Sequence, residues 1–325
     1  MGIDRRKFAA LVVGVLAAPA MASAQDNGRH KVGEAMARFA AITPNAGGLV
    51  SVQQGGDQWE VAHRAETPLF VGSAIKTFIL AQALREVEAG ALSEEAQQPI
   101  DDNVRSLISP VFANLTGQTQ LRSALEAMIA HSDNTGTDVA LAACGVDKVR
   151  ALVAQAGLAN TRVCSSTRKL FSYLAGAPLG ADIGWQGMQG IMKDVMPGPP
   201  RSPMNGEETM ASSPRDLVRW YQTSLAGAYF AKPETLVEFK RILAMGDAIS
   251  QVAPPDVAAY AKGGSIDWNG FHCFAFAGQV VFGQARANLC FAVNWQGDDA
   301  SVKPTFLAYK NAVADVLVAV QKAVS

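Results

Sequence analysis

Strand-like patterns occur at both ends of this chain and helix-like patterns occupy its middle, and this order limits the folds that it can adopt. Two short strand-like runs near the start, 49–53 and 59–63, flank a Gly-Gly-Asp turn and predict a β-hairpin. Three further runs lie near the end, at 258–266, 271–282 and 287–295. The pattern therefore predicts one sheet, assembled from both chain ends, that encloses a helical lobe.

Apolar residues at helical spacing fill the region between the two strand groups. After Ser73, Ile75, Phe78 and Ile79 recur at three- and four-residue intervals, and the pattern stops at Gly90. Further helices are predicted at 32–39, 121–130, 135–143, 146–156, 214–226, 232–245 and 304–324. The last of these helices is expected to cover one face of the sheet.

The first residues of the chain are typical of an export signal. Residues 4–8 read Asp-Arg-Arg-Lys-Phe, an apolar run follows at 9–20, and 22–24 supplies small residues for cleavage. The paired arginines indicate the twin-arginine type, and an ordinary Sec signal is the alternative. The apolar run is shorter than the roughly 20 residues of a membrane span and contains Pro19, which disfavours an uncleaved anchor. No later segment qualifies as a membrane span, so we expect none after processing. We therefore predict a signal peptide, 1–24, and a periplasmic protein.

Charge and cysteine usage narrow the functional classes. The chain has 28 basic and 29 acidic residues, and after the leader its Lys and Arg are scattered, so we expect neither nucleic acid nor an anionic membrane surface as a partner. Its dispersed histidines and cysteines favour no metal site and no cofactor. In an oxidising compartment Cys144 and Cys164 are the more plausible disulfide pair, whereas Cys273 and Cys290 are expected to be buried thiols. A monomer that acts on a small neutral or anionic molecule fits these observations.

Ser73 and Lys76 form a Ser-x-x-Lys motif at the start of a predicted helix. A separation of three residues puts both side chains on one helix face, so the amine can reach the hydroxyl. A serine becomes an effective nucleophile when an adjacent base takes its proton, and lysine serves as that base where burial or a nearby cation disfavours its charged form. A helix-capping serine and a solvated lysine are the alternative interpretation.

Two further motifs follow in the chain. The first, near a predicted helix start, consists of Ser132, Asp133 and Asn134. The second, on a predicted late strand, consists of Lys262, Gly263, Gly264 and Ser265. Ser-x-x-Lys, Ser-Asp-Asn and Lys-Thr-Gly in this order are the signature of class A β-lactamases and penicillin-binding proteins. The segments around all three motifs resemble this family. Alternatively, Ser132 and Asn134 are helix caps and Lys262 is a surface lysine, while Asp133 is expected to be structural.

The resemblance implies an α/β fold of the β-lactamase and transpeptidase type. In that fold an antiparallel five-stranded sheet is flanked by the terminal helices and joined to an all-helical lobe. We expect 25–325 to be one catalytic domain, with a sheet lobe from about 30–72 and 250–325 and a helical lobe at about 73–249.

The resemblance also implies catalytic roles. Ser73 is the implied nucleophile, Lys76 its base or part of the proton relay, and Ser132 the group that passes a proton to the leaving nitrogen. The backbone N–H groups of Ser73 and Ser265 are the implied oxyanion hole.

The implied substrate-binding residues are Asn134, Lys262, Gly264 and Ser265. The third motif reads Lys-Gly-Gly here, so its middle hydroxyl is missing, although a glycine lets a substrate approach the strand closely. The implied activity is hydrolysis of a β-lactam through an acyl-enzyme. The alternatives are a D-alanyl-D-alanine peptidase or an esterase with the same chemistry that acts on an acyl-peptide or ester, and a penicillin-binding sensor that is acylated without turnover.

One element of the family pattern is missing. Class A β-lactamases carry a Glu within an E-x-x-L-N pattern, which positions the water that releases the acyl group. After 161–163 this chain has no acidic residue before Asp182, and 165–208 forms a long Gly- and Pro-rich segment in which 185–195 best fits a helix. Four later carboxylates are candidates to replace this Glu: Asp182, Asp194, Glu207 and Glu208. The alternative interpretation is that they are solvated charges on the protein surface.

Overall fold

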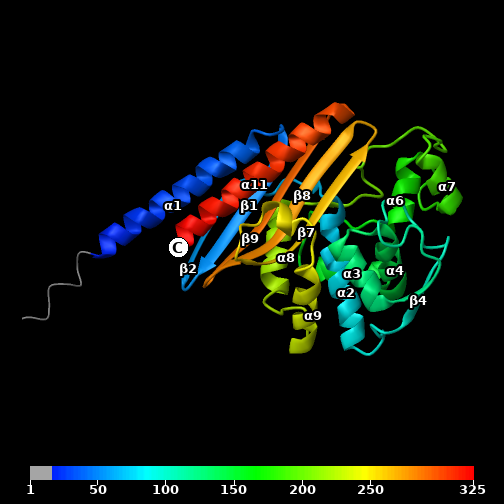
Figure 1. Ribbon diagram of the computed structural model, residues 1–325, viewed down its shortest axis with the longest axis horizontal. Helices are drawn as coiled ribbons and strands as arrows, with labels where there is room; N and C mark the ends of the chain where they lie inside the picture. Colours follow the sequence, from blue (N-terminus) through cyan, green and yellow to red (C-terminus); the bar gives the residue numbers. More distant parts are fainter. Residues whose placement is uncertain (1–16) are drawn as a thin grey trace, which may run out of the picture.

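The computed structural model describes residues 17–325, which form a five-stranded antiparallel sheet with helices on both faces (Figure 1). The strand order is β2-β1-β9-β8-β7. The strands are β1 (Asn45–Gln54), β2 (Asp57–His63), β7 (Ala258–Trp268), β8 (Phe271–Phe282) and β9 (Ala285–Gln296). Because β1 pairs with β9, the N-terminal hairpin and the C-terminal strands share one sheet, which confirms the predicted fold class.

Both faces of the central strands are buried. Along β9, Leu289 and Phe291 face the terminal helices, whereas Cys290 and Ala292 pack into the core beneath the helical lobe. Successive strand residues point to opposite faces, so a strand covered on both sides has a nearly continuous apolar sequence. The continuous apolar sequence of β9 therefore predicts a strand even though apolar and polar residues do not alternate along it.

The two terminal helices cover one face of the sheet and pack against each other along their length (Figure 1). They are α1 (Ala17–Ala40) and α11 (Val302–Val324). Phe39 of α1 and Tyr309 of α11 contact each other edge to face, and Phe39 also contacts Phe291 of β9. The terminal helix was therefore correctly predicted to cover a sheet face.

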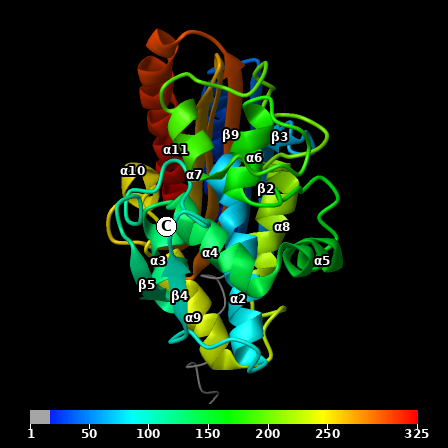
Figure 2. The same ribbon diagram turned by 90° about the vertical axis from the view of Figure 1, so that its right-hand side faces the viewer.

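The helical lobe packs against the opposite face of the sheet (Figure 1 and Figure 2). Its helices are α2 (Lys76–Glu88), α3 (Leu121–Ala130), α4 (Asn134–Cys144), α5 (Val146–Gln155), α6 (Thr167–Leu174), α7 (Gly184–Ile191), α8 (Pro214–Ser224) and α9 (Pro233–Leu243). The short helix α10 (Ile249–Val252) instead packs against α11 and β7. Trp220 of α8 stands at the centre of the helical lobe, where its indole contacts the ring of Phe78 and donates to the hydroxyl of Thr77 at 3.0 Å.

Several elements were not predicted. The segment 165–208 contains α6 as well as α7, and just after it β6 (Ala211–Ser212) pairs with β3 (Leu69–Phe70). Another small antiparallel pair joins β4 (Gln97–Ile100) to β5 (Gly117–Gln120). Two-residue strands and short helices carry too few residues for a periodic pattern, so tertiary contacts decide them.

The expected disulfide is not formed, because all four cysteines are free and buried. Cys144 and Cys164 belong to the core of the helical lobe, where a thiol packs as a small apolar group. Cys273 and Cys290 are buried thiols, as predicted, and they are not opposite each other because Cys290 pairs with Ala277. Burial raises the pKa of Cys144 to about 12.

The predicted leader falls mainly outside the described residues, and its last part, from residue 17 onward, lies in α1. Among the residues that the structure describes, no helix combines the length and apolar character of a membrane span. The signal peptide and its twin-arginine type therefore remain predictions.

Candidate active site

Ser73 lies in the first turn of a short 3-10 helix, η1 (Gly72–Ile75), which continues directly into α2. Gly72 has a φ of +53°, a left-handed conformation that glycine adopts without strain. The N-cap residue of η1 is Val71, and no side chain caps this helix. The interpretation of Ser73 as a capping serine is therefore wrong, and its half-buried hydroxyl is available for chemistry.

Lys76 is fully buried, which contradicts the alternative of a solvated lysine. Its Nζ donates to the carbonyl oxygen of Ser132 at 2.7 Å and to Oδ1 of Asn134 at 2.8 Å, and it lies 3.5 Å from Oγ of Ser132. Burial and the nearby charge of Lys262 lower the pKa of Lys76 well below its usual value. A neutral amine has two N–H groups and one lone pair. Two oxygen acceptors use both N–H groups, so the lone pair stays free to accept a proton.

The Ser-Asp-Asn motif forms the turn that leads into α4. Asp133 is the N-cap of α4, and its carboxylate accepts three backbone N–H groups, which confirms its structural role. Ser132 has a φ of +55°, a conformation that costs a non-glycine residue about 1 to 3 kcal/mol and is often found at functional sites. The amide of Asn134 donates to the carbonyl of Leu107 at 2.8 Å, which fixes Oδ1 toward Lys76.

Lys262 on β7 is also buried, so the interpretation as a surface lysine is wrong. Its Nζ donates to the carbonyl oxygen of Gly263 at 2.9 Å and lies 3.9 Å from Oδ1 of Asp247. Burial lowers the pKa of Lys262 to about 8, although the carboxylate of Asp247 opposes the shift. Lys76 contacts Ser132, and Lys262 lines the same pocket as Ser132, so two buried amines with lowered pKa values lie near this serine.

Two glycines bring β7 against the segment that carries Ser73. A methyl group on Gly264 would lie 2.0 Å from the carbonyl oxygen of Val71 and 2.9 Å from the backbone nitrogen of Ser73. A methyl group on Gly72 would lie 3.1 Å from the backbone nitrogen of Ser265. The absence of side chains at these positions lets the backbone segments that carry the N–H groups of Ser73 and Ser265 approach each other closely.

We expect Gly264→Ala to destabilise the protein by about 1 to 3 kcal/mol, because the new methyl group overlaps the backbone of the Ser73 segment. Gly56→Ala is the matched control, since no atom lies within 4 Å of its added methyl group. Thermal unfolding of both variants checks this prediction. Equal melting temperatures for the two variants would contradict the close contact between β7 and η1.

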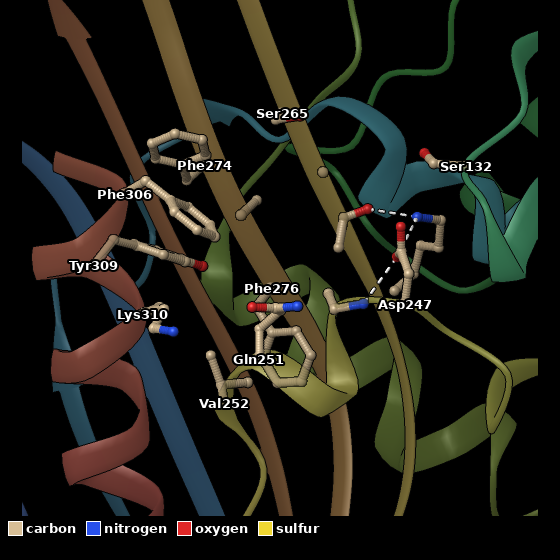
Figure 3. A pocket seen from close by; sticks show the side chains of 15 residues that line it. Ser132, Asp247, Gln251, Val252, Ser265, Phe274, Phe276, Phe306, Tyr309 and Lys310 are labelled. Atoms are coloured by element: carbon tan, nitrogen blue, oxygen red, sulfur yellow. Dashed lines mark hydrogen bonds and ion pairs between the residues drawn. The ribbon is translucent and has the colours of Figure 1, made fainter. Parts of the chain in front are cut away.

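A pocket of about 370 Å³ opens beside these residues (Figure 3). Ser132, Lys262, Gly264 and Ser265, four of the seven predicted site residues, line it. Ser73, Lys76 and Asn134 do not line it. Ser73 adjoins it through Gly264, and Lys76 contacts both Ser132 and Asn134. The structure therefore brings all seven predicted residues into one neighbourhood at the junction of the two lobes.

Comparison with known proteins agrees with this arrangement. Residues 31–296 match the family described as the beta-lactamase enzyme family. The chain belongs to this family. A β-lactamase-like hydrolase is therefore the functional class of the chain. A search of curated proteins gives no match.

Solved structures of β-lactamases share the fold of this family member at low sequence identity. A β-lactamase from Xanthomonas campestris is 19% identical, with a TM-score of 0.67, over 93% of this chain and 99% of that chain. A β-lactamase from Sphaerobacter thermophilus is 17% identical, with a TM-score of 0.64, over 89% and 96%. A further solved structure, that of PBP-A, is 15% identical, with a TM-score of 0.66, over 92% and 96%.

None of the four candidate carboxylates lines the pocket of this family member. Asp182 accepts from Nη2 of Arg168 at 2.8 Å, and Glu208 accepts from the backbone N–H of Ser165 at 2.8 Å. Asp194 and Glu207 are exposed. Each of the first two carboxylates thus has a structural partner. In residues 17–325, no group of three or more His, Cys, Asp or Glu side chains is placed to hold a metal ion.

Asp138 is a buried carboxylate near Lys76 that sequence analysis missed. It accepts the backbone N–H of Thr167 at 2.6 Å and that of Arg168 at 3.0 Å, so it anchors the start of α6. Burial raises the pKa of Asp138 to about 6, against the effect of these hydrogen bonds. Asp138 follows Asn134 by four residues and therefore shares its helix face, which is the sequence signal that could have identified it.

Cys164 precedes this anchored helix and lies within electrostatic range of Lys76. Its thiol is fully buried, and burial raises its pKa well above the usual value. The thiol therefore stays protonated at neutral pH and cannot serve as a base there.

Proposed function

We propose that this protein opens β-lactam rings through an acyl-enzyme on Ser73. The observation that carries the proposal is the buried Lys76, three residues after Ser73, with both N–H groups of its neutral form directed to Ser132 and Asn134. A base in this state suits removal of a proton from a serine hydroxyl, and a solvated lysine does not.

In the proposed acylation, the lone pair of Lys76 takes the hydroxyl proton of Ser73 while Oγ bonds to the lactam carbonyl carbon. The oxyanion that forms accepts from the N–H groups of Ser73 and Ser265, and losing one such donor typically raises the barrier by about 2.7 to 4 kcal/mol. As the carbon–nitrogen bond breaks, Ser132 gives its proton to the ring nitrogen and recovers one from Lys76. The 3.5 Å separation between Nζ of Lys76 and Oγ of Ser132 supports this transfer.

Binding of the substrate is proposed to use the other predicted residues. Asn134 hydrogen-bonds the side-chain amide on the acyl side, and Lys262 attracts the carboxylate on the leaving side. The substrate lies along β7, where Gly264 and Ser265 offer backbone and no obstructing side chain. A small anionic molecule is therefore the proposed ligand class.

Product counting separates this proposal from its alternatives. A chromogenic cephalosporin should give many product molecules per protein molecule, whereas a sensor gives one. A D-alanyl-D-alanine peptide and a simple aryl ester, assayed in parallel, test the peptidase and esterase alternatives. Turnover of the peptide or ester without reaction of the cephalosporin would contradict the proposal.

We expect acylation by a carboxylate-bearing β-lactam to decline by about 10- to 100-fold as the pH rises through about 8. Lys262 loses its proton in this range, and a charge-assisted hydrogen bond is worth about 1.5 to 3 kcal/mol. Any remaining deprotonation of Lys76 raises the rate with pH, and the methyl ester described next, which lacks the carboxylate, reports this opposite effect alone. The measurement is the acylation rate constant as a function of pH, with the neutral methyl ester of the same compound as a control. An equal decline for acid and ester would contradict the role of Lys262.

We also propose that the protein is exported in a folded state to the periplasm, on the basis of Arg5 and Arg6. Replacing both arginines by lysine is expected to leave the protein in the cytoplasm. Fractionation of cells that express the parent and the variant measures this. Normal periplasmic accumulation of the variant would favour a Sec signal.

A further inference from the structure

The pocket beside Ser132 does not end at the motif residues. It continues past Gly263 and Gly264 on β7 to the face of the sheet that α11 covers (Figure 3). A methyl group on Gly263 would lie 2.6 Å from Cβ of Ala248, so the strand has no room for a side chain there. The middle position of the third motif therefore accommodates only a glycine in this pocket wall.

Aromatic side chains from β8 and α11 form the far wall of this pocket. The rings of Phe274 and Phe306 are 5.2 Å apart, and those of Phe274 and Tyr309 are 5.8 Å apart. Phe276 completes the wall beside them (Figure 3). Phe274 and Phe306 are half-buried, so part of each ring faces the open pocket. We call Phe274, Phe276, Phe306 and Tyr309 the aromatic wall.

Lys310 lies next to the aromatic wall, and its side chain lines the same pocket (Figure 3). Among the described residues it has no carboxylate partner, whereas Lys262 has Asp247 within 3.9 Å. A cation beside aromatic rings suits an apolar ring that carries an acidic group. This chemistry differs from that of the polar neighbourhood around Asn134, which does not line the pocket.

We propose that the aromatic wall and Lys310 form a subsite for an acidic aromatic substituent on the leaving-group side of the substrate. The inference rests on the proposed function for its orientation. Ser132, which protonates the leaving nitrogen, and Lys262, which attracts the leaving-side carboxylate, line this pocket, whereas the residues of the acyl side do not. The part of the substrate that extends past Ser132 and Lys262 is therefore the leaving-group side.

Equilibrium binding to the full-length Ser73→Ala variant tests the subsite without requiring any reaction. The probes are two cephalosporins that differ only at the ring carbon next to the carboxylate-bearing carbon, with a methyl group in one and a carboxyphenyl group in the other. Titration calorimetry should show about 3- to 30-fold tighter binding of the carboxyphenyl compound, because a single aromatic pair and a charge contribute effects of this order. Phe306→Ala and Lys310→Gln, each added to Ser73→Ala, should reduce this preference.

Leu307→Ala and Lys303→Gln are the matched controls, since both residues are exposed on α11 and neither lines the pocket. They should keep the full preference. Equal binding of the two compounds, no binding of either, or an undiminished preference in both Phe306→Ala and Lys310→Gln would overturn the subsite. Acylation of Ser73 in the parent protein is measured separately, so failure of the subsite and failure of the proposed function give different results.

Discussion

Replacing Ser73 with alanine is expected to lower the rate constant for acylation by a penicillin by about 10⁴- to 10⁶-fold. The reason is that the variant keeps Lys76, Ser132 and Lys262 but has no atom that can bond to the lactam carbonyl carbon. Stopped-flow measurement of ring opening, at equal protein concentrations, checks the effect.

Ser202→Ala is the matched control for this loss, because Ser202 is exposed and its hydroxyl has no hydrogen-bond partner among the described residues. It should react at the parent rate. Thermal unfolding of both variants separates lost chemistry from lost folding. Comparable acylation in Ser73→Ala and the parent would show that another nucleophile is used.

Hydrolysis of the acyl-enzyme is expected to be slower than its formation by about 10²- to 10⁴-fold, so that a burst precedes slow turnover. Acylation has its buried base, whereas the four candidate carboxylates for deacylation lie outside the pocket, two of them held by Arg168 and Ser165. A positioned general base usually contributes about this factor, which corresponds to about 3 to 5 kcal/mol of barrier. Rapid mixing with a chromogenic cephalosporin should resolve the burst and the later steady state.

Amide variants of the candidate carboxylates test the same expectation. Asp182→Asn, Asp194→Asn, Glu207→Gln and Glu208→Gln should leave the burst intact, and any variant that further slows the steady state identifies a base that reaches the attacking water. Asp138→Asn is the additional variant suggested by the structure, because this carboxylate is buried near Lys76. Rapid turnover without a burst in the parent and in every amide variant would contradict the prediction and indicate Lys76 or another group as the deacylating base.

The sequence was sufficient to predict the fold wherever a long periodic pattern meets a buried face. The prediction at 121–130 has the bounds of α3, and that at 271–282 has the bounds of β8. The sequence was insufficient to predict elements that form only through contacts between residues far apart in the chain. The short strands β3 and β6 exist because they pair with each other, and α6 begins where Asp138 holds Thr167.

In the candidate site, too, the sequence predicts some features and tertiary packing decides others. Motif spacing brought Ser73, Lys76, Ser132 and Lys262 to attention, but only tertiary packing makes the two lysines buried neighbours with lowered pKa values. No motif includes Asp138, although it interacts electrostatically with Lys76.

The aromatic wall depends on how α11 aligns with β8, and neither segment alone contains that information. The predicted pair of Cys144 and Cys164 failed for a related reason, because sequence separation and compartment do not determine whether two buried thiols face each other.

Mass spectrometry of the intact protein during reaction with a penicillin tests the central claim most directly. Because hydrolysis of the adduct is expected to be slow, the protein should gain the mass of one penicillin within the burst, and digestion should locate that mass on the peptide that contains Ser73. Ser73→Ala should stay unmodified under the same conditions. An adduct that persists in Ser73→Ala, or that maps to any other peptide, would contradict the assignment of Ser73 as the nucleophile.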